Sequence, residues 1–173
     1  MKSQYLGDSY DAVKRLWRDL LDEWAPLYAE SRFFSDDIKT EFTRLTKIPI
    51  LTDIQQGSFS ILNDPDTGIR LPGEKNQNEG RTHISIPTIA KQLQDNNVKC
   101  VITFDQSHYR QGRGSHEDQR ITKMDGLRQK GFQSMYYVSH APFLFAVRTQ
   151  ELMLELKNIL KAAGIPVSRF EEI

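Results

Sequence analysis

Cysteine is almost absent from the sequence, and its positive and negative charges cancel. The chain has one cysteine, Cys100, among 173 residues, so no disulfide bond can form within it and a cysteine-based zinc site is disfavoured. Lysine and arginine together number 23, as do aspartate and glutamate, which leaves a net charge of zero. A nucleic-acid-binding role would therefore have to rest on a local basic patch.

Several signals that would assign a location or a cofactor are also missing. No apolar run approaches the ~20 residues of a membrane-spanning helix, and the first residues lack the apolar core of a signal peptide, so we expect a cytoplasmic protein. The sequence has neither a Gly-x-Gly-x-x-Gly fingerprint after a strand nor a Walker phosphate-binding loop. Because an ordinary S-adenosylmethionine site needs a glycine-rich turn after its first strand, binding of this cofactor is not expected.

The composition that is present predicts one α/β domain. A hydrophobic content of 38% and an aromatic content of 10% are typical of a globular protein, and the length suits a single domain. Residues 1–46 are expected to form a helical layer, with a short helical turn within 27–34. Residues 47–173 are expected to form the core, which would begin with a short edge strand over 47–53.

Strand-like and helix-like segments alternate from Ser58 onward. The predicted strands are 58–63, 82–86, 99–105, 134–139 and 143–148, and the predicted helices are 86–94, 115–130 and 150–163. This order predicts a Rossmann-like, mostly parallel sheet with helices on both faces. The connection before the last strand is so short that this strand should be antiparallel.

Acidic residues follow two of the predicted strands. Asp64 and Asp66 flank Pro65 after the first of them, and Asp105 ends a later one. Ligands of such sheets bind outside the carboxyl ends of the strands, so we expect the three carboxylates to meet there. Oxygen-rich, sulfur-free sites favour Mg²⁺ or Mn²⁺, which predicts a catalytic metal site at Asp64, Asp66 and Asp105. The alternative is that the segment around Pro65 is an ordinary turn.

Other polar side chains follow the same strand ends. His108 and His140 are predicted to transfer protons near neutral pH, and Arg110 has the donors to clamp a phosphate. For His108 taken alone, an incidental position in a solvated loop is the favoured interpretation, and His140 is equally compatible with a structural hydrogen bond. Further substrate contacts are predicted for Gln106, Ser139 and His83.

A local basic region stands out in the otherwise neutral sequence. It consists of Arg110, Arg113, Arg120 and Lys123. Such a region can contact a nucleotide phosphate or a nucleic-acid backbone. A solvated helix face is the more common outcome for charges at this spacing.

Two resemblances add to this interpretation. Residues 4–8, 64–68 and 105–107, together with Arg110, resemble the motifs of an uncharacterised bacterial and phage protein family with an Asp-Pro-Asp-x-Gly motif, which implies no known activity. The element order from Ser58 onward resembles the C-terminal half of Rossmann-like methyltransferases, in which an Asp-Pro-Pro-Tyr-type motif follows the fourth strand. Here residues 64–67 depart from that motif at its third and fourth positions.

The sequence therefore favours a metal-assisted phosphoryl-transfer or phosphodiester-cleaving enzyme that acts on a nucleotide or nucleic acid. Two alternatives stay open at this point. One is a non-catalytic Rossmann-like module that binds a protein, nucleotide or nucleic acid. The other is a degenerate methyltransferase-like protein.

Overall fold

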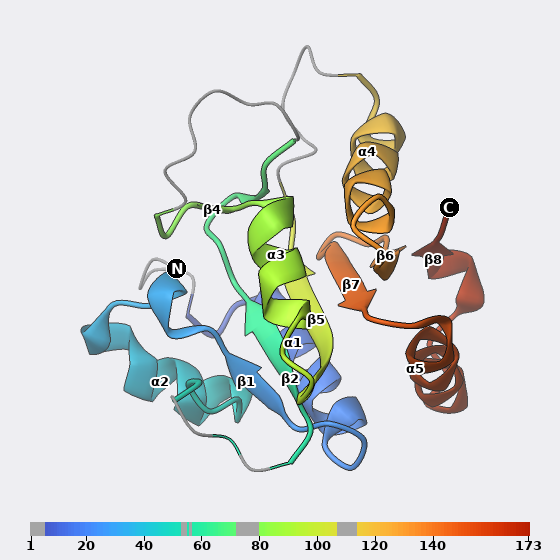
Figure 1. Ribbon diagram of the computed structural model, residues 1–173. Coiled ribbons are helices and arrows are strands. Elements are labelled where there is room, and N and C mark those ends of the chain that lie inside the picture. The colour runs from blue at the N-terminus through green and yellow to red at the C-terminus, as the bar shows by residue number, and fades with distance from the viewer. Residues whose placement is uncertain (1–5, 53–54, 56, 72–79, 107–113) are drawn as a thin grey trace.

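A six-stranded sheet forms the centre of the protein in the computed structural model, which describes residues 6–52, 55, 57–71, 80–106 and 114–173 (Figure 1). The strands lie in the order β1-β2-β5-β7-β6-β8. Their bounds are Leu27–Ala29 for β1, Phe59–Asn63 for β2, Val98–Phe104 for β5, Gln133–Tyr137 for β6, Phe143–Val147 for β7 and Phe170–Glu171 for β8.

The strand directions confirm the predicted Rossmann-like α/β sheet. β1, β2 and β5 are parallel neighbours, whereas β7 is antiparallel to both β5 and β6. β6 therefore runs in the same direction as the first three strands, and β8 pairs antiparallel to it. The antiparallel strand expected from residue 143 is β7, and it lies inside the sheet rather than at its edge.

Helices cover both faces of this sheet. α3 and α4 contact each other and pack over β5 and β6, while α1 and α5 contact each other across the opposite face (Figure 1). α2 packs beside α1. The helix bounds are Ser9–Leu21 for α1, Asp36–Thr46 for α2, Ile86–Leu93 for α3, His116–Arg128 for α4 and Gln150–Ala162 for α5.

α1 is fixed at its start by a cap and along its length by aromatic packing. The Asp8 carboxylate accepts hydrogen bonds from the backbone N–H groups of Tyr10 and Asp11, which satisfies two free donors of the first turn. Further along, Trp17 is fully buried, with its ring 5.0 Å from that of Tyr137 and 5.2 Å from that of Phe145 in edge-on geometry. The helix therefore lies firmly against β6 and β7.

Of two expectations for the N-terminal half, one is confirmed in part and one is wrong. The short helical turn expected within 27–34 is a 3₁₀ helix at Ser31–Phe33, but the edge strand β1, which was not expected, precedes it. The burial of Leu27 and Ala29, with Tyr28 between them half exposed, follows the two-residue period of a strand. The described residues 47–52 do not form the expected strand, and Ile50 makes an isolated bridge to Ala29. The N-terminal segment thus supplies the edge of the main sheet.

A second, smaller sheet lies beyond the end of β2. β3 (Gly68–Ile69) pairs in parallel with β4 (His83–Ile84) and contacts β5. The polar loop expected between Pro72 and Arg81 lies mostly outside the described residues. No helix in the described part of the chain combines the length and hydrophobicity that crossing a membrane requires.

Candidate functional site

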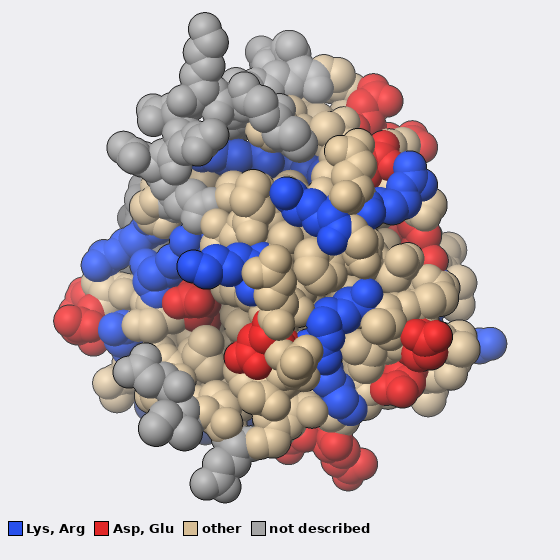
Figure 2. All heavy atoms as spheres, in the orientation of Figure 1, with Lys and Arg blue, Asp and Glu red and all other residues tan. Residues whose placement is uncertain are grey.

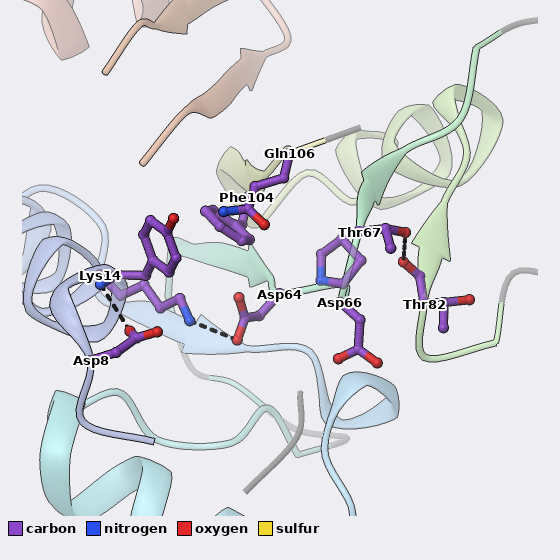
Figure 3. Close-up of a pocket in the computed structure, with 10 residues that line it drawn as sticks. Asp8, Lys14, Asp64, Asp66, Thr67, Thr82, Phe104 and Gln106 are labelled. Carbon is purple, nitrogen blue, oxygen red and sulfur yellow. Dashed lines mark hydrogen bonds and ion pairs between the residues drawn. The ribbon is translucent and has the colours of Figure 1, made fainter. Parts of the chain in front are cut away.

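A pocket of about 390 Å³ opens at the carboxyl ends of β2 and β5, beside the start of α1 (Figure 3). This is the edge of the sheet at which the sequence predicts a site. The lining combines acidic, aromatic and hydroxyl side chains. It consists of Asp8, Tyr10, Lys14, Asp64, Pro65, Asp66, Thr67, Thr82, Phe104 and Gln106.

A buried lysine between two carboxylates forms one side of the pocket. The Nζ atom of Lys14 lies 2.8 Å from Oδ2 of Asp64 and 2.9 Å from Oδ1 of Asp11. All three residues are at least 95% buried, and the second oxygen of Asp11 accepts a hydrogen bond from the backbone N–H of Gly7 at 2.7 Å. Two carboxylates share one ammonium group, so the ionised cluster carries a net charge of −1 away from bulk water.

The protonation equilibria of this cluster follow from its burial and charge. Burial alone would lower the pKa of Lys14, but the attraction of Asp64 and Asp11 outweighs it and raises the pKa above its ordinary value. For Asp64, burial raises the pKa, and the neighbouring Lys14 offsets this effect only in part. The carboxylate of Asp11 adds repulsion. Asp64 therefore takes up a proton more readily than an exposed aspartate.

The two oxygens of Asp64 have different environments. Oδ2 accepts the hydrogen bond from Lys14, whereas Oδ1 has no hydrogen-bond partner among the described residues. Figure 3 shows Oδ1 directed toward Phe104 and Gln106, while the carboxylate of Asp66 points away from that of Asp64. The pocket is thus lined by a carboxylate that Lys14 holds through Oδ2 and whose Oδ1 faces the pocket.

Asp105 lies outside the pocket and has a different role. Its side chain is fully buried, and Oδ2 accepts hydrogen bonds from Nζ of Lys123 and the hydroxyl of Tyr136, both at 2.7 Å. Oδ1 accepts from the backbone N–H of Ile69 at 2.9 Å. The carboxylate therefore joins α4, β6 and β3 inside the protein. Burial, and then the charge of Asp105, raises the pKa of Tyr136 well above its ordinary value.

The register of β2 and β5 explains why Asp105 does not join Asp64. Asn63 pairs with Thr103, so Asp64 is level with Phe104 and Asp105 lies one residue further along. Successive side chains of a strand point to opposite faces of the sheet. Asp64 and Phe104 consequently face α1 and the pocket, whereas Asp105 faces α4.

The predicted cluster of three carboxylates is accordingly not assembled. Asp64 and Asp66 both line the pocket, but Asp105 does not. Within the described ranges, no group of three or more His, Cys, Asp or Glu side chains is arranged to hold a metal ion. Among the described lining residues, a divalent cation could use the carboxylates of Asp64 and Asp66, since that of Asp8 caps α1, and it would need further ligands from the substrate or water.

The remaining predicted site residues have separate positions. Gln106 lines the pocket, and exposed His140 stacks on Tyr10 of the lining, with ring centroids 5.9 Å apart. Ser139 closes a turn, since its hydroxyl exchanges hydrogen bonds with the backbone of Ala141. His83 belongs to β4, and its Nδ1 atom lies 3.0 Å from Oγ1 of Thr82. His108 and Arg110 lie outside the described residues.

The described part of the predicted basic region does not form a surface patch. Arg120 is 7% exposed and makes a two-pronged ion pair with Glu171, and Lys123 is buried against Asp105. Arg113, like Arg110, lies outside the described residues. Figure 2 shows lysine and arginine side chains in separate stretches across this face, interrupted by acidic and uncharged residues.

Lys14 is the main site residue that the sequence reasoning misplaces. The apolar spacing of Val13, Leu16, Trp17 and Leu20 would assign it to the opposite, exposed side of α1, yet it is 2% exposed. The signal that identifies its position is the spacing of the buried residues Asp11, Lys14, Trp17 and Leu21, which places the charged pair on the same helix face as the apolar residues.

Comparison with known proteins finds no matching family model, no matching curated protein and no matching solved structure. The functional interpretation therefore depends on the site itself.

The raised pKa of Asp64 predicts a specific dependence of stability on pH. When the pKa of an acid is higher in the folded state than in the unfolded state, the folded protein loses stability as the pH rises. The loss begins near the unfolded-state pKa of about 4 and is complete above the folded-state pKa. Asp64→Asn removes this contribution. We expect the unfolding free energy of the wild type minus that of Asp64→Asn, measured by urea denaturation between pH 4 and 8, to decrease as the pH rises. A difference that stays constant or grows would contradict the assignment.

Gly68 provides a test of the Asp105 contact. It has a φ of +115°, and an added Cβ would lie 2.2 Å from Oδ1 and 2.8 Å from Cα of Asp105. We expect Gly68→Ala to lower the unfolding free energy by about 2 kcal/mol or more, because both the overlap and the backbone strain are unfavourable.

Gly80→Ala is the matched control for this substitution. A Cβ at Gly80 meets no described atom within 4 Å, so the change should stay within about 0.5 kcal/mol. Equal urea midpoints for the two variants would show that the close approach of Gly68 to Asp105 is not important for stability.

Proposed function

We propose that this protein is an enzyme that transfers a phosphoryl group or cleaves a phosphodiester of a nucleotide-type substrate, with its active site in the pocket at β2 and β5. The observation that supports this most is the geometry of Asp64. Its side chain is 97% buried and anchored to Lys14 through Oδ2, and Oδ1 faces the pocket. A carboxyl group with a raised pKa in a pocket is suited to act as a general base.

The charge of the pocket makes the proposed reaction dependent on a divalent cation. The described lining contains three carboxylates, those of Asp8, Asp64 and Asp66, and the one ammonium group of Lys14. Because Lys14 is already paired with Asp64 and Asp11, and the ionised cluster has a net charge of −1, little positive charge is left for a phosphate. Mg²⁺ is commonly held by one or two carboxylates plus substrate phosphates, and this coordination would bring the phosphate into the pocket.

The proposed chemical step is hydrolysis. A water molecule attacks phosphorus and gives one proton to Asp64, the bond from phosphorus to the leaving oxygen breaks, and that oxygen takes up a proton from solvent. Lys14 keeps Asp64 ionised enough to accept the proton, and the carboxylate of Asp66, which points away from that of Asp64, would be a ligand of the cation. A divalent cation bound there would supply positive charge for the developing charge on the phosphoryl oxygens.

The test is hydrolysis of bis(p-nitrophenyl) phosphate and of thymidine 5′-p-nitrophenyl phosphate with Mg²⁺, Mn²⁺ or a chelator. We expect release of nitrophenolate that requires the metal and falls at least ~100-fold in Asp64→Asn, which removes the base but keeps the shape of the side chain. Asp37→Asn is the matched control, because Asp37 is exposed in the first turn of α2 and does not line the pocket.

Circular dichroism would show that both variants are folded. Activity of Asp64→Asn equal to that of Asp37→Asn would remove Asp64 from the mechanism. A folded wild type that hydrolyses neither ester with either metal would instead support a non-catalytic binding module.

A further inference from the structure

Three aromatic rings from separate elements form a connected row at the pocket. Phe104, at the end of β5, is 6% exposed and lines the pocket. The ring of Tyr10, in the first turn of α1, lies 5.2 Å from it at an interplanar angle of 48°. His140, in the turn before β7, is exposed and lies 5.9 Å from Tyr10 at 27°. Each ring is thus held by a different part of the fold.

The position of Tyr10 is fixed before any ligand arrives. Its backbone N–H donates to the capping carboxylate of Asp8 at 2.9 Å, and its half-buried ring contacts those of Phe104 and His140 and lines the pocket. Aromatic side chains that keep a face accessible bind nucleobases by stacking, and ordering them in advance reduces the entropy lost on binding. Gln106, also in the lining, has an amide that can both donate to and accept from the edge of a base.

We propose that Tyr10, supported by Phe104 and His140, is the base-binding wall of the pocket, so that the ligand is a mononucleotide rather than a sugar phosphate or a nucleic-acid polymer. This inference rests on the proposed function for the nucleotide character of the substrate. Two observations favour a small ligand. The pocket volume of about 390 Å³ lies within the range of small-molecule sites, and the described residues Arg120 and Lys123 are occupied by Glu171 and Asp105 instead of facing a polymer backbone.

The test uses adenosine, which has no phosphate and therefore needs neither metal nor turnover, with ribose as the comparison. Isothermal titration calorimetry should show that adenosine binds the wild-type protein and that ribose at the same concentration does not. Tyr10→Leu, which removes the ring but keeps an apolar side chain, should weaken adenosine binding about 5- to 150-fold, the effect of losing one stacked base. His140→Ala should also weaken adenosine binding. Because His140 is exposed, the fold should tolerate this substitution.

Tyr28→Leu is the matched control, since Tyr28 is half-buried in β1 against Phe59 and does not line the pocket. It should leave adenosine binding unchanged. The base-binding wall is overturned if adenosine does not bind at millimolar concentration, or if Tyr10→Leu binds it as tightly as Tyr28→Leu. If adenosine binds through Tyr10 but the protein hydrolyses no ester, the base-binding wall is supported and only the proposed reaction is overturned.

Discussion

The ammonium group of Lys14, buried between the carboxylates of Asp11 and Asp64, is the interaction on which the candidate site depends. Its 2.8 Å contact with Asp64 ties the first turns of α1 to the end of β2, and its 2.9 Å contact with Asp11 lies within α1. Removing one partner of such a buried group leaves an uncompensated charge, which is strongly destabilising. The same contact fixes Asp64 and leaves one of its oxygens facing the pocket. Stability and the proposed chemistry therefore rest on one cluster.

The two faces of the sheet divide the polar residues at its carboxyl edge into two groups. Asp64 and Phe104 face α1 and line the pocket, whereas Asn63 and Asp105 face the other side. There Asn63 exchanges hydrogen bonds with Gln92 of α3, and Asp105 binds Lys123 of α4. Asp64 thus lines the pocket. Asp105 instead accepts a hydrogen bond from Ile69 and lies close to Gly68, and these contacts position the segment that carries Asp66 and Thr67.

The sequence predicts the sheet well because its strands are short apolar runs with turn residues between them, and its helices have clear caps such as Ser115 and Thr149. Because the strand ends can be located in this way, the sequence also predicts the edge of the sheet at which the pocket lies. Spacing along one strand cannot show the pairing register with the next, and a shift of one residue sends Asp105 to the opposite face. Lys14 and Lys123 are misplaced because charged side chains are normally solvated, and only their buried partners, distant in the sequence, reverse that expectation.

A double-mutant cycle between Lys14 and Asp64 tests the central claim most directly. The unfolding free energies of the wild type, Lys14→Met, Asp64→Asn and the double variant would be measured by urea denaturation at pH 7. Met fits between the rings of Phe42 and Phe104, which lie 5.8 and 5.6 Å from Nζ. We predict that the double variant is more stable than the sum of the single losses implies, by about 1 kcal/mol or more. Additivity to within about 0.5 kcal/mol would contradict the account.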